Sequence, residues 1–563
     1  MFKNMSPKLK KSLAVQGSIL AIAGLISKMI GFLYRIPMAN IVGNEGNGLY
    51  SVSFGIYGIA LTLSSYSCPL AVSKLMSARF AQGKPKNAHK VFRIAQLFAV
   101  STGFIAWMVL LFGAEYLADL YRKPGLEHPL RVLAPTTFIV AVLGTGRGYF
   151  QGHRNMVPTA VSQVIEQIVN AVVSIVAAAY FVLLSGGTIK GFVGSVRQVE
   201  NLPEDFTPAA GGAAGGTLGT LAGALTALIF ISILFIVGKK ARKAEVSGPD
   251  IADEDEKILW KALLLTIFPV ILSQSVYQLG YTLDDLIFGN IMVRMKGFSE
   301  RETTILQGIF NTQYNQMINL PAALATALAS AAIPTIAGAF ARKDTSEVLR
   351  KTDQVFRYNL LIAIPSTVGL AVLAEPIMKV LFPALGDYLP VAVLLLQTGS
   401  LAVVFYTLST LSAAVLQGCD HMWTPVRHAA ISLAIHAVLL SVLLIFTDMD
   451  VLALIIGNVT FPLVTSVMNI RSLKKLNGYS FDMKNVVLRP TGAAAIMGAF
   501  ALAVLLLLEY MGVGRIMQLA VPIIAAVVVY SVLIPVLHIM TPEEMASFPV
   551  IGKFFRKLMK TGK

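Results

Sequence analysis

Two basic residues lie inside the first long apolar segment of this chain, residues 13–42, where a charge is costly unless it has a partner or a function. Lys28 and Arg35 are seven residues apart, which is two helical turns, so they share one face of a helix. Ammonium and guanidinium groups bind anions, and a guanidinium can bind a phosphate through two hydrogen bonds. We therefore predict a cationic site for an anion within the membrane. In the alternative interpretation, Arg35 extends to the outer surface and Lys28 pairs with an acid.

Further polar residues follow near the predicted cytoplasmic ends of later segments. Lys74 is about one turn from such an end, so it either contacts the ligand first or extends to the surface. Arg147, Gln151 and Gly152 form a cytoplasmic motif whose ordinary roles are anchoring and helix capping.

Three acidic residues also lie within apolar segments. Glu166 is about a third of the way into its segment, whereas Asp284 and Asp285 lie in the outer third of theirs. A buried carboxylate of this kind either forms a structural ion pair, with Lys28 or Lys74 as partner, or binds a coupling ion such as H⁺ or Na⁺. Asp284 and Asp285 are adjacent, so at most one faces a common cavity.

The segment at 304–340 has an unusually polar stretch. Asn311, Asn315 and Asn319 are each four residues apart and are expected on one helical face. Such a stripe suits sugar or phosphate groups, and hydrogen bonding between helices is the equal alternative. The candidate cavity residues of this segment are Asn311, Gln313, Tyr314, Asn315 and Asn319.

The composition explains why charges inside these segments are informative. Of the 563 residues 55% are hydrophobic and only 13% charged, with a mean hydropathy of +0.70. A soluble protein has about 25% charged residues. The net charge of +16 comes from short basic clusters between apolar runs, which indicates membrane topology and not nucleic-acid binding.

Apolar runs of about 20 residues, enough to span a bilayer, recur along the whole chain. We predict an all-α polytopic membrane protein with about fourteen spans, near residues 13–42, 48–79, 91–113, 131–152, 156–185, 212–238, 258–290, 304–340, 355–383, 387–417, 426–447, 450–470, 488–510 and 515–540.

The loops between these spans alternate in charge. Basic clusters occur at the N-terminus, at 79–93, 239–243, 342–357 and 471–489, and at the C-terminus. By the positive-inside rule both termini are cytoplasmic, which requires an even number of spans. The tail, 541–563, combines apolar residues at helical spacing with lysines and is predicted to lie on the anionic leaflet.

An internal repeat sets the predicted domains. Phe150–Pro158 and Leu416–Pro425 share a Gln-Gly turn and a proline that begins the next helix. Pro69 and Pro334 repeat at nearly the same offset. We therefore predict parallel halves with a cavity between them: an N-lobe at 1–240, a C-lobe at 241–485, an extra helix pair at 486–540 and the tail at 541–563.

Several other site classes receive no support from the sequence. Cys68 and Cys419 belong to no CxxC pair, and the seven histidines show no metal-ligand spacing, so no metal site is predicted. The glycine-rich run at 211–223 lacks the Gly-Lys-Ser/Thr ending of a nucleotide-binding loop, and its spacings Gly212/Gly216 and Gly219/Gly223 fit close helix packing. No cofactor is expected.

Five motifs resemble the MOP superfamily of flippases and exporters, close to its MurJ/YtgP and stage V sporulation protein B group. They are the segments 27–37, 43–50, 69–74, 147–152 and 158–167. The resemblance implies a non-enzymatic flippase that moves undecaprenyl-pyrophosphate-linked sugars, most often lipid II for peptidoglycan, to the outer leaflet of the bacterial cell membrane. It also implies that Lys28 and Arg35 occupy positions at which the family uses basic residues.

The partners expected on this basis are the lipid-linked oligosaccharide, membrane lipid and cell-wall synthesis enzymes, with the chain acting as a monomer. One alternative is a flippase for capsular, teichoic or spore-related lipid-linked sugars. Another is a multidrug or cation antiporter, an interpretation that twelve spans and an acidic cavity would favour. A membrane glycosyltransferase would need catalytic groups in the 185–211 loop. That loop has Glu200, Glu204 and Asp205 but no histidine.

Overall fold

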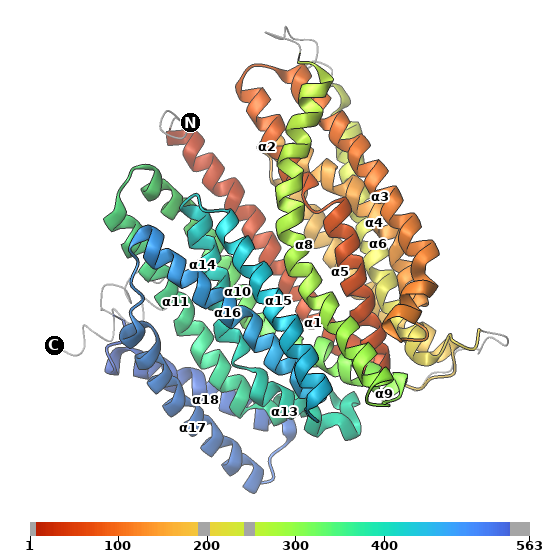
Figure 1. Ribbon diagram of the computed structural model, residues 1–563, viewed down its shortest axis with the longest axis vertical. Coiled ribbons are helices and arrows are strands. Elements are labelled where there is room, and N and C mark those ends of the chain that lie inside the picture. The colour runs from red at the N-terminus through yellow and green to blue at the C-terminus, as the bar shows by residue number, and fades with distance from the viewer. Residues whose placement is uncertain (1–6, 190–202, 241, 243–253, 541–563) are drawn as a thin grey trace. The chain divides into compact units, whose positions relative to one another are not determined.

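The computed structural model describes residues 7–189, 203–240, 242 and 254–540. These residues are helical with short connections, and they contain no β-strand (Figure 1). The predicted all-α fold is therefore confirmed. The predicted tail at 541–563 lies outside the described residues.

The chain divides into two compact units, of which the first comprises Met1–Thr312 and Ala437–Val451. Its helices are α1 (Pro7–Ser64), α2 (Cys68–Ala81), α3 (Pro85–Tyr121), α4 (Glu127–Gly152), α5 (Val157–Leu184), α6 (Pro208–Val237), α8 (Glu256–Arg294) and α9 (Glu300–Gly308).

The second unit comprises Gln313–His436 and Leu452–Lys563. A π-helical turn, η2 (Ile309–Tyr314), contains the boundary between the units. The elements that follow are α10 (Asn315–Ala341), α11 (Thr345–Val372), α12 (Ala374–Leu381), η3 (Pro383–Tyr388), α13 (Leu389–Gly399), α14 (Ala402–Gly418), α15 (Trp423–Phe446), α16 (Val451–Asn477), η4 (Lys484–Leu488), α17 (Arg489–Tyr510) and α18 (Arg515–Val536).

Local sequence explains where many of these helices begin. Proline occupies one of the first two positions of α2, α3, α5 and α6, where its missing N–H costs nothing. Side chains accept backbone hydrogen bonds at other starts, as Asp255 does before α8, Ser299 before α9 and Asp344 before α11.

The predicted count of fourteen spans is not established by helix length and hydropathy. Among the described residues 11 helices satisfy these criteria, or 12 if the bent pair at 383–418 is one span. Two segments account for the difference. The 58-residue α1 is broken at Gly43 (φ 75°, ψ 174°), and its length of about 87 Å exceeds two bilayer cores. The other is α10, which is not among the 11.

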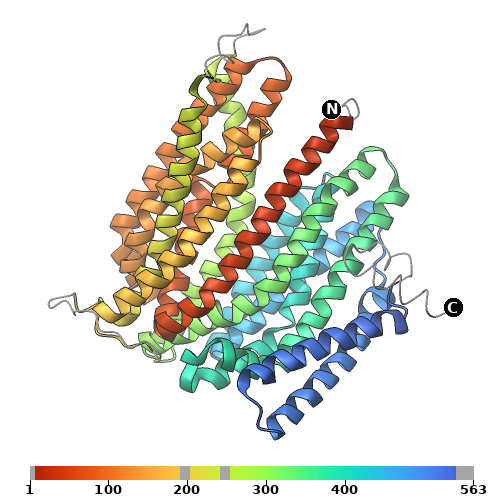
Figure 2. The same cartoon turned by 180° about the vertical axis from the view of Figure 1, so that it is seen from behind.

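The compact units do not coincide with the sequence halves, because α8 and α9 belong to the first unit. The proposed duplication concerns sequence and not packing, so it stays a prediction. The extra pair α17 and α18 pack side by side in both views (Figures 1 and 2).

Glycines allow the closest helix packing in the first unit. Gly215, Gly219 and Gly223 of α6 are four residues apart and face α5. A methyl group at Gly219 would lie 2.1 Å from Ser174 Oγ and 2.5 Å from the Asn170 carbonyl oxygen. The two backbones therefore meet without intervening side chains.

Candidate functional site

The predicted cationic pair lies on the first half of α1. Lys28 and Arg35 are both exposed, and their seven-residue spacing in a continuous helix places them on one side. The exposed large apolar side chains of this half of α1 lie roughly 60–160° further round the helix from Lys28, at 100° per residue. They are those of Ile22, Leu25, Ile26, Met29 and Leu33. One exposed side of this helix is thus cationic and another is suited to lipid.

A series of polar contacts next to Arg35 connects α1 to α5. The guanidinium interacts with the phenol groups of Tyr34 and Tyr50, whose side chains are buried. Asn170 of α5 donates a hydrogen bond to the Tyr34 hydroxyl (3.4 Å), and Ser174 donates to the Asn170 side-chain oxygen (2.9 Å). Packing of α1 against α5 therefore limits the positions that Arg35 can take.

Lys74 of α2 is exposed, whereas the cations that follow it are engaged. Arg79 and Lys84 both contact Glu254, at 2.8 and 3.1 Å. Burial would raise the pKa of Glu254, but hydrogen bonds from Lys84 and Arg79 lower it below its ordinary value. Arg79 and Lys84 thus connect the basic cluster at 79–93 to the segment before α8, and Lys74 is not part of this connection.

Glu166 pairs with Arg147, a partner that the sequence analysis did not name. Arg147 Nη2 lies 2.6 Å from Glu166 Oε2, and Arg147 Nε donates to Ser162 Oγ at 2.9 Å. Side-chain exposures of 13% and 21% leave the pair mostly buried. This arrangement connects α4 to α5 and gives Glu166 a structural role.

The rest of the cytoplasmic motif also serves packing. Gln151 donates to Thr159 Oγ1 at 3.4 Å, which again joins α4 to α5. Gly152 faces α2, where a methyl group would lie 2.9 Å from Met76 Cβ. The motif therefore fixes three helices relative to one another inside the first unit.

The acidic pair of α8 is buried, and Asp285 lies in a polar cluster. Asn311 donates to Asp285 Oδ1 at 2.7 Å, and Gln307 donates to the Asp285 backbone oxygen at 2.9 Å. Asp284 is 8% exposed and Asp285 6%. Neither carboxylate presents much surface to a ligand.

Lys123, which the sequence analysis missed, is buried near this cluster. It lies in the α3–α4 connection and donates to Thr304 Oγ1 at 3.1 Å. Burial lowers the pKa of Lys123 to about 7, although the carboxylates of Asp285 and Glu300 act to raise it. In the sequence it resembles an ordinary loop lysine, so only its neighbours in space reveal it.

The predicted asparagine stripe is not continuous. Its first member, Asn311, lies in η2, where the i→i+5 hydrogen bonds of a π-helix shift the register relative to α10. Asn315 is 9% exposed, whereas Asn319 is exposed. Asn315 and Asn319 keep their four-residue spacing within α10, whereas Asn311 lies before that helix in the π-turn, so the α-helical spacing is interrupted only between Asn311 and Asn315.

Two other candidates of this segment are buried. Gln313 is 1% exposed and Tyr314 is fully buried. The Tyr314 hydroxyl donates to the Gly399 carbonyl at 2.9 Å, and it also lies 3.2 Å from Asn458 Oδ1. These contacts place Tyr314 in the interior of the second unit, where it supports packing.

The residues thus fall into an exposed cationic group, Lys28, Arg35 and Lys74, and buried polar networks around the acids. The exposed group can attract an anion, and the buried groups hold the helices together. With its many apolar helices, the chain belongs to the class of multi-span membrane proteins.

Comparison with solved structures shows which membrane proteins share this fold. The chain is similar to lipid II flippase MurJ in an inward closed conformation, with a TM-score of 0.67 and 14% identity over 96% of this chain and 99% of that one. It is also similar to an inward-facing MATE family transporter of the MOP superfamily, with a TM-score of 0.63 and 15% identity over 82% and 100%. At these identities the likeness is one of fold.

The model of the polysaccharide biosynthesis protein family matches residues 13–340, more than half of the chain, and the chain belongs to this family. Three relatives come from Bacillus subtilis (strain 168). Stage V sporulation protein B is 24% identical over 95% of this chain and 97% of its own. The uncharacterized membrane protein YabM is 26% identical over 97% of each chain, and lipid II flippase MurJ is 26% identical over 85% and 86%.

Proposed function

We propose that this protein is a flippase that moves undecaprenyl-pyrophosphate-linked sugars, with lipid II as cargo, from the inner to the outer leaflet of the cell membrane. The observation that carries the proposal is the exposed Lys28–Arg35 pair on one side of a spanning helix. A pyrophosphate crossing hydrocarbon needs cations at mid-depth, while its lipid tail can stay in the bilayer.

The relatives support this choice of cargo. A chain named lipid II flippase MurJ aligns with 85% of this one, and the MurJ fold covers 96% of it. We expect alternating access and no covalent chemistry. The sequence has no nucleotide-binding loop, so an ion gradient, the membrane potential or consumption of the product would drive transport.

The test is rescue of bacterial cells depleted of their lipid II flippase. The wild-type chain should restore growth, and the double variant Lys28→Ala/Arg35→Ala should not, at equal abundance in the membrane. The matched control is Lys240→Ala/Arg294→Ala, which removes the same charge from two exposed helix ends. It should rescue as the wild type does.

Growth restored equally by the Lys28→Ala/Arg35→Ala variant would refute the cationic site. Arg35→Lys should rescue only in part, because an ammonium cannot bind phosphate through two parallel hydrogen bonds.

A second candidate cargo is a spore-related lipid-linked sugar, favoured by the likeness to stage V sporulation protein B over 95% of the chain. Restoration of heat-resistant spores in a strain lacking that protein, without rescue of the flippase-depleted cells, would favour this cargo over lipid II.

A further inference from the structure

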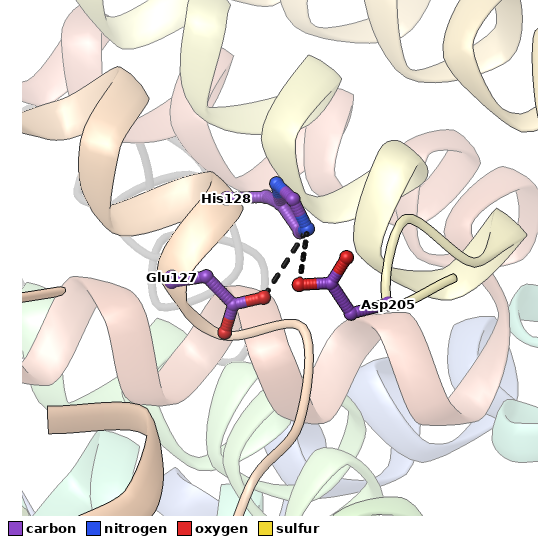
Figure 3. Close-up of side chains that lie close together, drawn as sticks. All are labelled: Glu127, His128 and Asp205. Carbon is purple, nitrogen blue, oxygen red and sulfur yellow. Dashed lines mark ion pairs between the residues drawn. The ribbon is translucent and has the colours of Figure 1, made fainter. Parts of the chain in front are cut away.

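We propose that Glu127, His128 and Asp205 form a binding site for a divalent transition-metal ion, with Zn²⁺ as the reference ion (Figure 3). Glu127 and His128 are the first residues of α4, and Asp205 lies in the segment that precedes α6. All three belong to the first unit, on the side predicted to be extracytoplasmic. One donor atom from each lies within 4.8 Å of the other two.

The spacing of the donor atoms fits a small tetrahedral ion. His128 Nε2 lies 3.2 Å from Glu127 Oε1 and 3.3 Å from Asp205 Oδ2. Ligands about 2.0–2.1 Å from a tetrahedral zinc ion are about 3.3–3.4 Å from one another. An ion can therefore bind with little movement of the side chains.

Buried donor atoms without hydrogen bonds supply an independent observation. Glu127 Oε1 and His128 Nε2 are buried and have no hydrogen-bond partner among the described residues. The side chain of Glu127 is only 7% exposed, and its Oε1 points toward His128 Nε2 (Figure 3). The two short contacts of the imidazole are ion pairs that form only when the ring is protonated. A metal ion between the three groups would satisfy these atoms.

The electrostatics of the cluster also favour a cation. The carboxylates of Glu127 and Asp205 interact directly with each other, and their like charges repel when both are ionised. Either a shared proton or a bound cation removes this repulsion. The imidazole nitrogen beside them selects a transition metal over Ca²⁺ or Mg²⁺, which prefer oxygen ligands.

Neighbouring residues hold the ligands in place. The ring of His128 packs edge-on against Phe206, with centroids 4.9 Å apart. Gly125, with φ of +86°, lets the α3–α4 connection approach the segment around Asp205, since a methyl group there would lie 3.2 Å from the Asp205 carbonyl oxygen. The bound ion would tie the start of α4 to the segment before α6.

A cavity of about 350 Å³ borders the cluster and provides access. Five carboxylates and two basic side chains line it, so it attracts cations. Asp205 is the most exposed ligand, with 46% of its side chain accessible, and marks the open side. Three protein ligands leave a fourth position for water.

Zinc binding by the full-length protein in detergent tests the proposal. After removal of metals with a chelator, Zn²⁺ would be titrated against a chromophoric competitor, and bound zinc would be counted by mass spectrometry. We expect one ion per chain and a Tm that rises with zinc concentration. Substitution with Co²⁺ should produce the visible absorption of tetrahedral cobalt. An equal rise in Tm with Ca²⁺ would overturn the assignment to a transition metal.

The variants His128→Gln and Asp205→Asn should each bind zinc about 100-fold more weakly. Asp205 is partly exposed, so Asp205→Asn without metal should have the same Tm as the metal-free wild type. This variant therefore separates loss of zinc binding from loss of folding. The control His421→Gln removes a histidine elsewhere and should bind as the wild type does. Equal zinc binding by the wild type and both ligand variants would refute the proposed metal site. Glu127, His128 and Asp205 would then be a cluster that shares a proton.

Discussion

At the level of single residues, the pair Arg147–Glu166 offers a direct measure of what a partly buried ion pair contributes to this fold. Glu166→Gln would leave Arg147 without a counter-charge in a site where the two side chains are 13% and 21% exposed. We expect a loss of about 2 kcal/mol, less than a fully buried pair would lose. A fall of a few degrees in Tm in detergent would report it.

The exposed pair Arg342–Glu347 is the matched control for this substitution. Its side chains are 58% and 30% exposed, so Glu347→Gln should leave Tm nearly unchanged. The double variant Arg147→Gln/Glu166→Gln should recover part of the loss, because it removes both charges. Equal Tm values for Glu166→Gln and Glu347→Gln would show that the pair does not stabilise α4 against α5.

The same residue scale shows what one sequence could predict. Lys28 and Arg35 are conspicuous in the sequence because they are cations in an apolar run, and their seven-residue spacing predicts a shared helical face. Tyr314 could not be placed, since nothing local says whether a tyrosine faces a cavity or a neighbouring helix. The contacts of Lys123 and the Glu127–Asp205 approach depend on segments far apart in the chain.

At the level of elements, the contact between α5 and α6 depends on glycine. Gly219→Ala would place a methyl group 2.1 Å from Ser174 Oγ and 2.5 Å from the Asn170 backbone oxygen, so the helices must separate. We expect a loss of about 1–3 kcal/mol, measured as a fall in Tm. The control Gly113→Ala adds a methyl group to α3 where nothing lies within 4 Å, and its Tm should stay level or rise slightly. A stable Gly219→Ala variant would contradict the close contact.

The sequence predicted the packing face of α6 better than it predicted the structure of the segment at 304–340. Glycines at four-residue spacing mark a helix face, and Gly219 and Gly223 do face α5. Gly216 instead comes close to α1, at Tyr50, and Gly212 lies near both Val182 of α5 and Val42 of α1. No comparable spacing marks the π-turn η2, in which Thr312 donates a hydrogen bond to the backbone oxygen of Asn47, far away in the sequence.

At the level of the whole molecule, the alternation of basic loops predicts both the number of membrane crossings and the side of each terminus. Helix length alone predicts only a number of spans. Length and hydropathy give 11 or 12 spans among the described residues. The break at Gly43 and a crossing by α10 would bring the number to fourteen and return both basic termini to the cytoplasm. The compact units were not foreseen, because a sequence repeat does not specify which helices pack together.

Cysteine labelling in intact cells tests this topology. Both native cysteines are buried, so replacing Cys68 and Cys419 with alanine gives an unreactive background. Ser299→Cys and Thr345→Cys then introduce exposed positions on either side of α9–α10. A membrane-impermeant maleimide should label Ser299→Cys in intact cells, and Thr345→Cys only after permeabilisation, because the basic loop at 342–357 is predicted inside. Labelling of both from the same side would mean that α10 does not cross. A reporter fused to the C-terminus should be cytoplasmic, since an even number of crossings must separate it from a cytoplasmic N-terminus.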